Sequence, residues 1–84
     1  MLLPSQPVNL TVEQIAALND KLSAMRHDIN NHLSLIVAAV ELIRLKPSTA
    51  ERMMATLIEQ PPRISECLRK FSDEFDRNLH ITKS

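Results

Sequence analysis

Residues 33–43 of the chain read LSLIVAAVELI, and within this stretch only Ser34 and Glu41 are polar. Neither glycine nor proline occurs between Thr11 and Lys46, so we expect the stretch to belong to one long helix. A helix that is apolar nearly all round must be covered on several sides, and a single neighbouring helix covers only one of them. The stretch therefore predicts a helix inside a bundle.

The same helix, predicted over residues 12–45, carries a regular apolar seam. Thr11-Val12-Glu13-Gln14 fits a capping box, in which the Thr11 hydroxyl and the Gln14 amide satisfy free backbone N–H groups. Steps of three and four residues separate the seam residues, a spacing typical of coiled-coil and bundle helices. These residues are Ile15, Leu18, Leu22, Met25, Ile29, His32, Ile36, Ala39 and Ile43.

Lys46-Pro47-Ser48 predicts a tight turn, followed by a second capping box at Ser48-Thr49-Ala50-Glu51. Because the connection is short, the next helix should run antiparallel to the first. It is expected to end near Leu79, with an inner face of Met53 or Met54, Leu57, Ile64, Leu68, Phe71 and Phe75. Pro61-Pro62 removes two backbone donors, which predicts a bend or a short break there.

The composition limits both the fold class and the partners. The chain has 84 residues, no glycine, no Trp or Tyr and a formal net charge of zero. Such a composition favours an all-α fold in one domain. It argues against nucleic acid or a membrane surface as partner, since both attract basic patches. With no membrane span, no secretory leader and a single cysteine, Cys67, we expect a cytoplasmic protein with a reduced, partly packed thiol.

Two helices that pack only on each other would leave a broad apolar face uncovered. Pairing two hairpins into a four-helix bundle covers it, so we expect a homodimer with residues 33–43 near its centre. We expect residues 1–10 to form an extended lead-in, residues 11–80 the helical hairpin, and residues 81–84 a frayed tail.

The long helix carries three polar residues of chemical interest, His27, Asp28 and Asn31. His27 lies halfway between Met25 and Ile29 of the seam and should face solvent, with Asn31 one turn further on the same face. Asp28 should turn towards the side of the bundle. An exposed histidine beside a carboxylate and an amide is a reactive arrangement with no packing role, although RHDINN is also compatible with an ordinary solvated helix face.

The sequence MRHDINNHLSLIVAAVELI, residues 25–43, resembles the phosphoacceptor box of sensor histidine kinases. In that box the histidine is followed by Glu or Asp, two variable residues, Asn or Thr, and then an apolar helix. Arg before and Asp after the histidine is also similar to sporulation-type phosphotransferases. The resemblance implies a dimerisation and histidine phosphotransfer domain, which is a dimeric four-helix bundle of two antiparallel hairpins.

The resemblance also implies roles for these residues. His27 would carry the phosphoryl group, and Asp28 would accept a hydrogen bond from its ring, fix the tautomer and raise its nucleophilicity. Asn31 would orient a water molecule for dephosphorylation of a response regulator. Arg26 could neutralise phosphate or be an ordinary surface cation.

The chain departs from the family's pattern in two places. His32 stands where many kinases have proline five residues after the phosphoacceptor, which puts a helix-bending signal step in doubt. Because His32 falls on the seam, we interpret it as a packed, hydrogen-bonded histidine, and we expect no role for His80. No glycine-rich nucleotide lid or P-loop occurs, so we do not expect the chain to phosphorylate itself from ATP.

We therefore expect a phosphotransfer module that exchanges a phosphoryl group between His27 and an aspartate of a response-regulator receiver domain. No cofactor is expected in the chain itself, because Mg²⁺ would come with the receiver. A kinase ATP-binding domain would act in trans or belong to a longer chain. The receiver would contact the face around His27 and the start of the second helix, such as Arg52 and Thr56. The alternatives are a non-catalytic helical dimerisation or adaptor module, and a domain with phosphatase activity alone.

Overall fold

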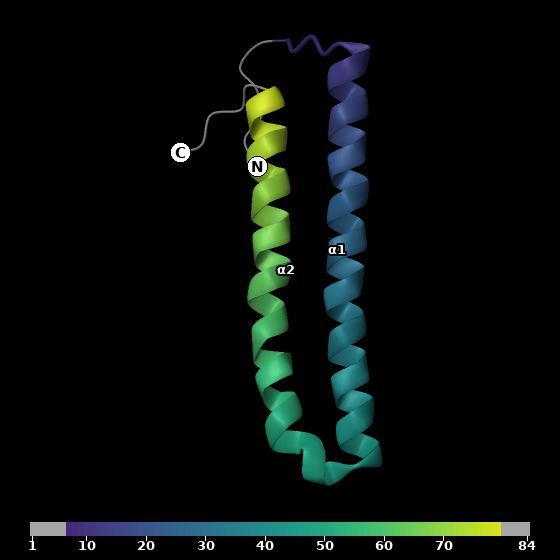
Figure 1. Cartoon of the computed structure of the whole chain (residues 1–84). Coiled ribbons are helices and arrows are strands. Elements are labelled where there is room, and N and C mark those ends of the chain that lie inside the picture. Colours follow the sequence, from purple (N-terminus) through teal and green to yellow (C-terminus); the bar gives the residue numbers. More distant parts are fainter. Residues whose placement is uncertain (1–6, 80–84) are drawn as a thin grey trace.

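A computed structural model describes residues 7–79, which form two long antiparallel helices joined by a short turn (Figure 1). Helix α1 spans Val12–Leu45, the 3-10 helix η1 spans Pro47–Thr49, and helix α2 spans Ala50–Asn78. Within residues 7–79 there is no strand, so the all-α helical hairpin is confirmed. Residues 1–6 of the expected lead-in, the expected tail 81–84 and His80 lie outside the described residues.

Helix α1 begins at the predicted capping box. The Thr11 hydroxyl accepts a hydrogen bond from the Gln14 backbone N–H at 3.0 Å, and the Gln14 side chain accepts one from the Thr11 N–H at 2.8 Å. Both bonds satisfy donors that the first turn of a helix leaves free. The start of the 34-residue helix is thus fixed by hydrogen bonds within Thr11–Gln14, without a contribution from α2.

The predicted second capping box, at Ser48, is wrong. Thr49 is the residue that precedes α2, and its side chain makes no capping hydrogen bond. Its buried hydroxyl instead donates to the Lys46 carbonyl at 2.8 Å, and the Thr49 N–H donates to the same carbonyl at 2.9 Å. Thr49 therefore closes the turn behind it, because the 3-10 geometry starting at Pro47 brings the Lys46 carbonyl within reach.

Helix α2 runs through Pro61 and Pro62 without interruption, so of the predicted bend or short break the short break is excluded. The two prolines have no N–H to give to the carbonyls of Leu57 and Ile58, four residues earlier. Both proline side chains are exposed and do not obstruct the packing against α1. The helix therefore continues, with two backbone hydrogen bonds fewer at this level.

The predicted seam of α1 is confirmed. Its members from Leu18 to Ile43 are half-buried, and Ala39 is buried. Ile15 is exposed because it lies opposite the last residues of α2. On α2 the inward positions are Met53, Leu57, Gln60, Ile64, Cys67, Phe71 and Phe75.

One predicted inward position on α2 needs correction. Leu68 is about half exposed, and its neighbour Cys67 is more buried; of the two alternatives Met53 and Met54, Met53 is the inward one. The inner face of α2 is therefore rotated towards Cys67 and Gln60 relative to the one that hydrophobicity alone predicts.

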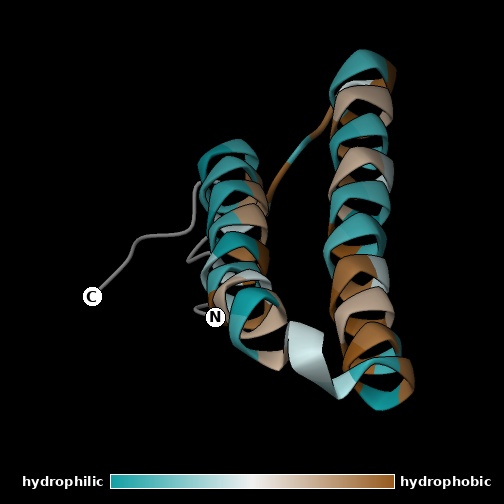
Figure 2. Ribbon diagram, turned by 60° about the horizontal axis from the view of Figure 1, so that its bottom comes forward, coloured by the Kyte–Doolittle hydropathy of each residue, from teal (hydrophilic) through white to brown (hydrophobic). Residues whose placement is uncertain are grey.

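The hairpin is a single layer of helices. It measures 57 × 28 × 12 Å along its principal axes, and the smallest dimension is about the 10–12 Å diameter of one helix. Among the described residues Ala39, 3% exposed, is the one buried hydrophobic residue. Figure 2 shows hydrophobic colour gathered in the half of α1 nearest the turn. In this half Leu35, Val37, Val40 and Leu42 are exposed. The hairpin by itself leaves this apolar surface uncovered.

The exposed apolar residues on one long side of the hairpin form a surface that we call the apolar flank. On α1, Val40, Leu33 and Val37 lie about 40°, 60° and 100° from Ile36 in one rotational sense. Leu68 and Met54 are displaced from Gln60 of α2 in the same sense, by about 80° and 120°. Since the helices are antiparallel, residues displaced in the same sense lie on the same side. The apolar flank thus consists of Leu33, Val37, Val40, Met54 and Leu68, all exposed.

The capping hydrogen bonds give a direct test of this local structure. Thr11→Ala should lower the free energy of unfolding by about 1 kcal/mol, because it leaves an N–H of the first turn without its acceptor. Ser48→Ala is the matched control and should change it by less than about 0.5 kcal/mol, because Ser48 caps no helix here. Urea unfolding followed by circular dichroism measures both. A larger loss for Ser48→Ala than for Thr11→Ala would contradict this description.

Candidate functional site

His27 lies on the face of α1 opposite α2, and its side chain is exposed as predicted. It is about 180° from Ile36 around the helix, so the packing of the hairpin leaves the ring accessible. Asn31, one turn further on, is also exposed, and its amide nitrogen lies 3.4 Å from His27 Nε2. The structure therefore brings together two of the three predicted site residues.

This contact favours one tautomer of a neutral His27 ring. With the Asn31 amide nitrogen as donor, Nε2 is the acceptor and Nδ1 carries the proton. At 3.4 Å the hydrogen bond is long, so it costs little to exchange it for another partner. The ring thus has a lone pair on Nε2 at the protein surface, as a nucleophile requires.

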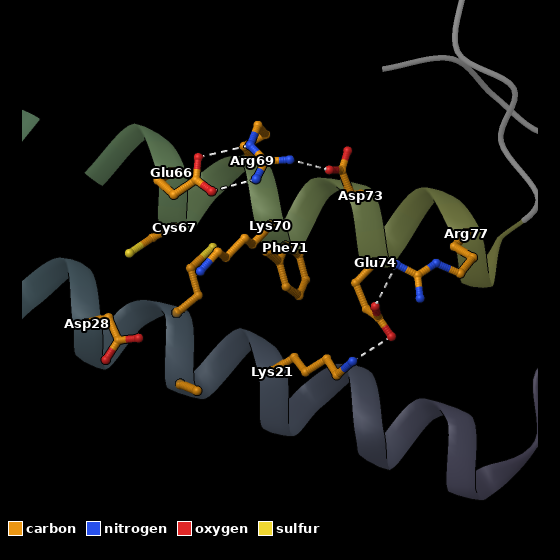
Figure 3. Close-up of a pocket in the computed structure, with 12 residues that line it drawn as sticks. Lys21, Asp28, Glu66, Cys67, Arg69, Lys70, Phe71, Asp73, Glu74 and Arg77 are labelled. Atoms are coloured by element: carbon orange, nitrogen blue, oxygen red, sulfur yellow. Dashed lines mark hydrogen bonds and ion pairs between the residues drawn. The ribbon is translucent and has the colours of Figure 1, made fainter. Parts of the chain in front are cut away.

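Asp28 has a different position from the one that the family resemblance implies. Within the described residues it accepts no hydrogen bond from the His27 ring. It lines an open groove between α1 and α2, across from Cys67 and Lys70 (Figure 3). The reason is geometric, because consecutive residues on a helix point about 100° apart. An orienting role for Asp28 would require a change of its side-chain conformation.

The groove carries the ion pair that links the two helices near their open end. Lys21 of α1 pairs with Glu74 of α2, and Arg77 approaches the same carboxylate at 3.2 Å (Figure 3). The hydrogen bond from Lys21 holds the pKa of Glu74 below its usual value, and Arg77 adds to the effect. Earlier in α2, a hydrogen bond from Arg69 lowers the pKa of Glu66, and the same interaction raises the pKa of Arg69.

His32 is packed between the helices, as its place on the seam predicts. It is half-buried, and its Nδ1 lies 2.7 Å from Oε1 of Gln60, which is 4% exposed. The amide oxygen can only accept, so Nδ1 donates. His32 and His27 therefore differ completely in environment, and His27 is the accessible one of the two.

A mixed surface adjoins the candidate site on the side of the hairpin opposite to the apolar flank. Leu35 and Leu42 follow Asn31 along the same side of α1, displaced from Ile36 by about 100° and 120°. Both are exposed. On α2, Arg52 and Arg63 lie on the same side and are exposed, and among the described residues neither belongs to an ion pair.

No group of three or more His, Cys, Asp or Glu side chains within the described residues could hold a metal ion. Neither of the described helices has a segment of sufficient length and hydropathy to cross a membrane.

Comparison of the chain with protein-family models, with curated proteins and with solved structures found no match. The chemistry of the site therefore has to be argued from its own residues.

Sequence reasoning missed two features of this region. The burial of Gln60 could have been found, because residues 53, 57, 60 and 64 continue the three-and-four spacing of the α2 seam. The pairing of Lys21 with Glu74 could not, because it depends on the axial alignment of the helices, which periodicity leaves undetermined.

The Lys21–Glu74 pair predicts a pH dependence of stability. A carboxylate whose pKa is lowered in the folded protein adds stability above its unfolded-state pKa, and this stability is lost as pH falls through the folded-state value. Lys21→Gln should therefore raise the pKa of Glu74 and lower the free energy of unfolding at pH 7. The difference from the unmodified protein should vanish near pH 2.

Carboxyl titration by NMR and urea unfolding at the two pH values measure these effects. Arg52→Gln is the control, since Arg52 is in no ion pair of the described residues. A Lys21→Gln difference that persisted unchanged at low pH would contradict the assignment.

Proposed function

We propose that the chain is a histidine phosphotransfer module of two-component signalling, with His27 as the residue that carries the phosphoryl group. The observation that carries the proposal is the exposed His27 ring, whose Nε2 is contacted, among the described residues, by the long hydrogen bond from Asn31 alone. The resemblance of residues 25–43 to a phosphoacceptor box supports the same residue.

In the transfer step, Nε2 of His27 attacks the phosphorus of an aspartyl phosphate on a receiver domain. The new P–N bond forms as the P–O bond to the aspartate breaks, and the carboxylate leaves. The ring keeps its Nδ1 proton, so the phosphorylated imidazole is cationic, which favours the return of the phosphoryl group. Asn31 must leave Nε2 for this step, and its amide can then hold a water molecule or a phosphoryl oxygen.

A dimer fits the surface of the hairpin. The apolar flank is exposed over both helices, in a layer one helix thick that buries only Ala39 among its described hydrophobic residues. Packing two apolar flanks against each other would produce a four-helix bundle and bury Leu33, Val37 and Val40 near its centre. His27 lies away from this flank and would stay accessible in the dimer.

The receiver is proposed to dock on the opposite side, beside the site. Leu35 and Leu42 provide apolar contacts next to Asn31, and Arg52 and Arg63 provide positive charge that no ion pair within residues 7–79 neutralises. Such a surface suits a partner with an acidic rim around its phosphoacceptor aspartate. Thr56, half-buried on the same side, would lie at the edge of the contact.

Phosphorylation of His27 can be tested directly. After incubation with acetyl phosphate or with phosphorylated receiver domains, we expect acid-labile, base-stable phosphate on His27, detected by mass spectrometry of the intact chain. His27→Gln should abolish the label, because it removes the nucleophile. Asn31→Ala should slow loss of phosphate from the receiver, with Asn30→Ala as the matched control because Asn30 points to another side of α1.

Absence of label with every donor would instead favour the non-catalytic adaptor. A label that remained in His27→Gln would place the acceptor elsewhere.

The proposed dimer interface can be tested with two matched substitutions. Val40 and Leu35 are 49% and 48% exposed on the same half of α1, on opposite sides of the hairpin. Val40→Glu should raise the dimer dissociation constant at least about a hundredfold, because each dimer would bury two unpaired carboxylates. Leu35→Glu should leave it nearly unchanged. Sedimentation equilibrium measures both, and equal effects would argue against the apolar flank as the interface.

A further inference from the structure

A hydrogen bond joins α1 to α2 inside the apolar seam, next to the candidate site on the side towards the turn. His32 and Gln60 are the polar members of their two seams, and the atoms Nδ1 and Oε1 are 2.7 Å apart. Gln60 is almost fully buried. A buried polar group that loses its partner costs more than the hydrogen bond contributed, so each residue strongly favours the alignment that places it opposite the other.

The same level of α2 is where its backbone is weakest. Gln60 directly precedes Pro61 and Pro62, which leave the carbonyls of Leu57 and Ile58 without helical donors. Helices bend most easily where this ladder is interrupted. The buried side-chain contact to α1 therefore lies next to the one part of α2 whose direction the backbone fixes least.

We propose that His32 and Gln60 act as a positioning pair that sets the axial register of α2 on α1 and holds the proline step of α2 in place. Residues 63–78 follow this step and lie alongside the part of α1 that carries His27 and Asp28. The pair thus determines where this part of α2 lies relative to the candidate site. The inference is independent of whether His27 accepts a phosphoryl group.

Apolar residues at these two positions would not replace the pair. An apolar seam with steps of three and four can slip along its partner with little loss of burial, whereas a single buried polar pair distinguishes one register. Removing both polar groups together can even raise stability, because no buried group is left unpaired. Register and stability should therefore respond differently, and this separates a positioning role from a merely structural one.

Cys67 offers a built-in probe of this movement. It is the lone cysteine of the chain, it lies on the same face of α2 two turns after Gln60, and it lines the groove half-buried. If residues 63–78 moved relative to α1, the thiol would be exposed more often. Its rate of reaction with a disulfide reagent under native conditions therefore reports the opening of this part of the hairpin.

The experiment uses the full chain with the double substitution His32→Leu and Gln60→Leu. We expect an unchanged or higher free energy of unfolding, together with a rise of about fivefold to tenfold in the rate of Cys67 labelling. Gln60→Glu retains an acceptor for Nδ1 and should keep the rate of the unmodified protein. Ile36→Leu with Leu57→Ile, one layer closer to the turn, is the matched control and should also keep it.

An unchanged labelling rate in the double variant would overturn the proposal, and so would an equal rise in the Ile36/Leu57 control. Should the double variant fail to fold, Gln60→Met takes its place. It keeps the length of the side chain and removes the acceptor, so its Cys67 should still react faster, and an unchanged rate would again overturn the proposal.

Discussion

The constraint on which the structure depends is that a pair of helices buries only one stripe of each. The hairpin is about one helix thick, so a side chain more than a quarter turn from the seam has nothing above it. Residues 33–43 are apolar on nearly every side, and Leu35, Val37, Val40 and Leu42 are exposed as a result. The hydrophobic effect favours covering such a surface, and the exposure of Val37 and Val40 on the apolar flank is the physical ground for the proposed dimer.

The two ends of the hairpin differ in chemistry, and the candidate site lies where they meet. Towards the turn the surface is mainly apolar, while towards the open end the groove between the helices holds Lys21, Glu74 and Arg77. The His32–Gln60 pair marks the boundary, and His27 and Asn31 lie just beyond it on the outer face. A partner that contacts the site would therefore meet both an apolar and a charged surface.

Local sequence signals predicted the helices well. The capping box fixed the start of α1, Pro47 marked the turn, and the three-and-four spacing identified the seam of α1 from Leu18 to Ile43. The errors arose where tertiary geometry decides. Thr49 bonds backwards into the turn, α2 continues through its two exposed prolines, and Cys67 lies inside in place of Leu68. For the site, exposure of His27 followed from helix geometry, but the position of the Asp28 side chain did not.

The turn at Pro47–Thr49 joins the two arms at one end, and the Lys21–Glu74 ion pair links them near the other, where α1 begins and α2 ends side by side (Figure 1). Each arm is about 45 to 50 Å long at 1.5 Å per residue, so a change of only 10° in the angle between them would separate the far ends by about 8 Å. A small change of angle at the turn therefore produces a large displacement at the opposite end of the hairpin.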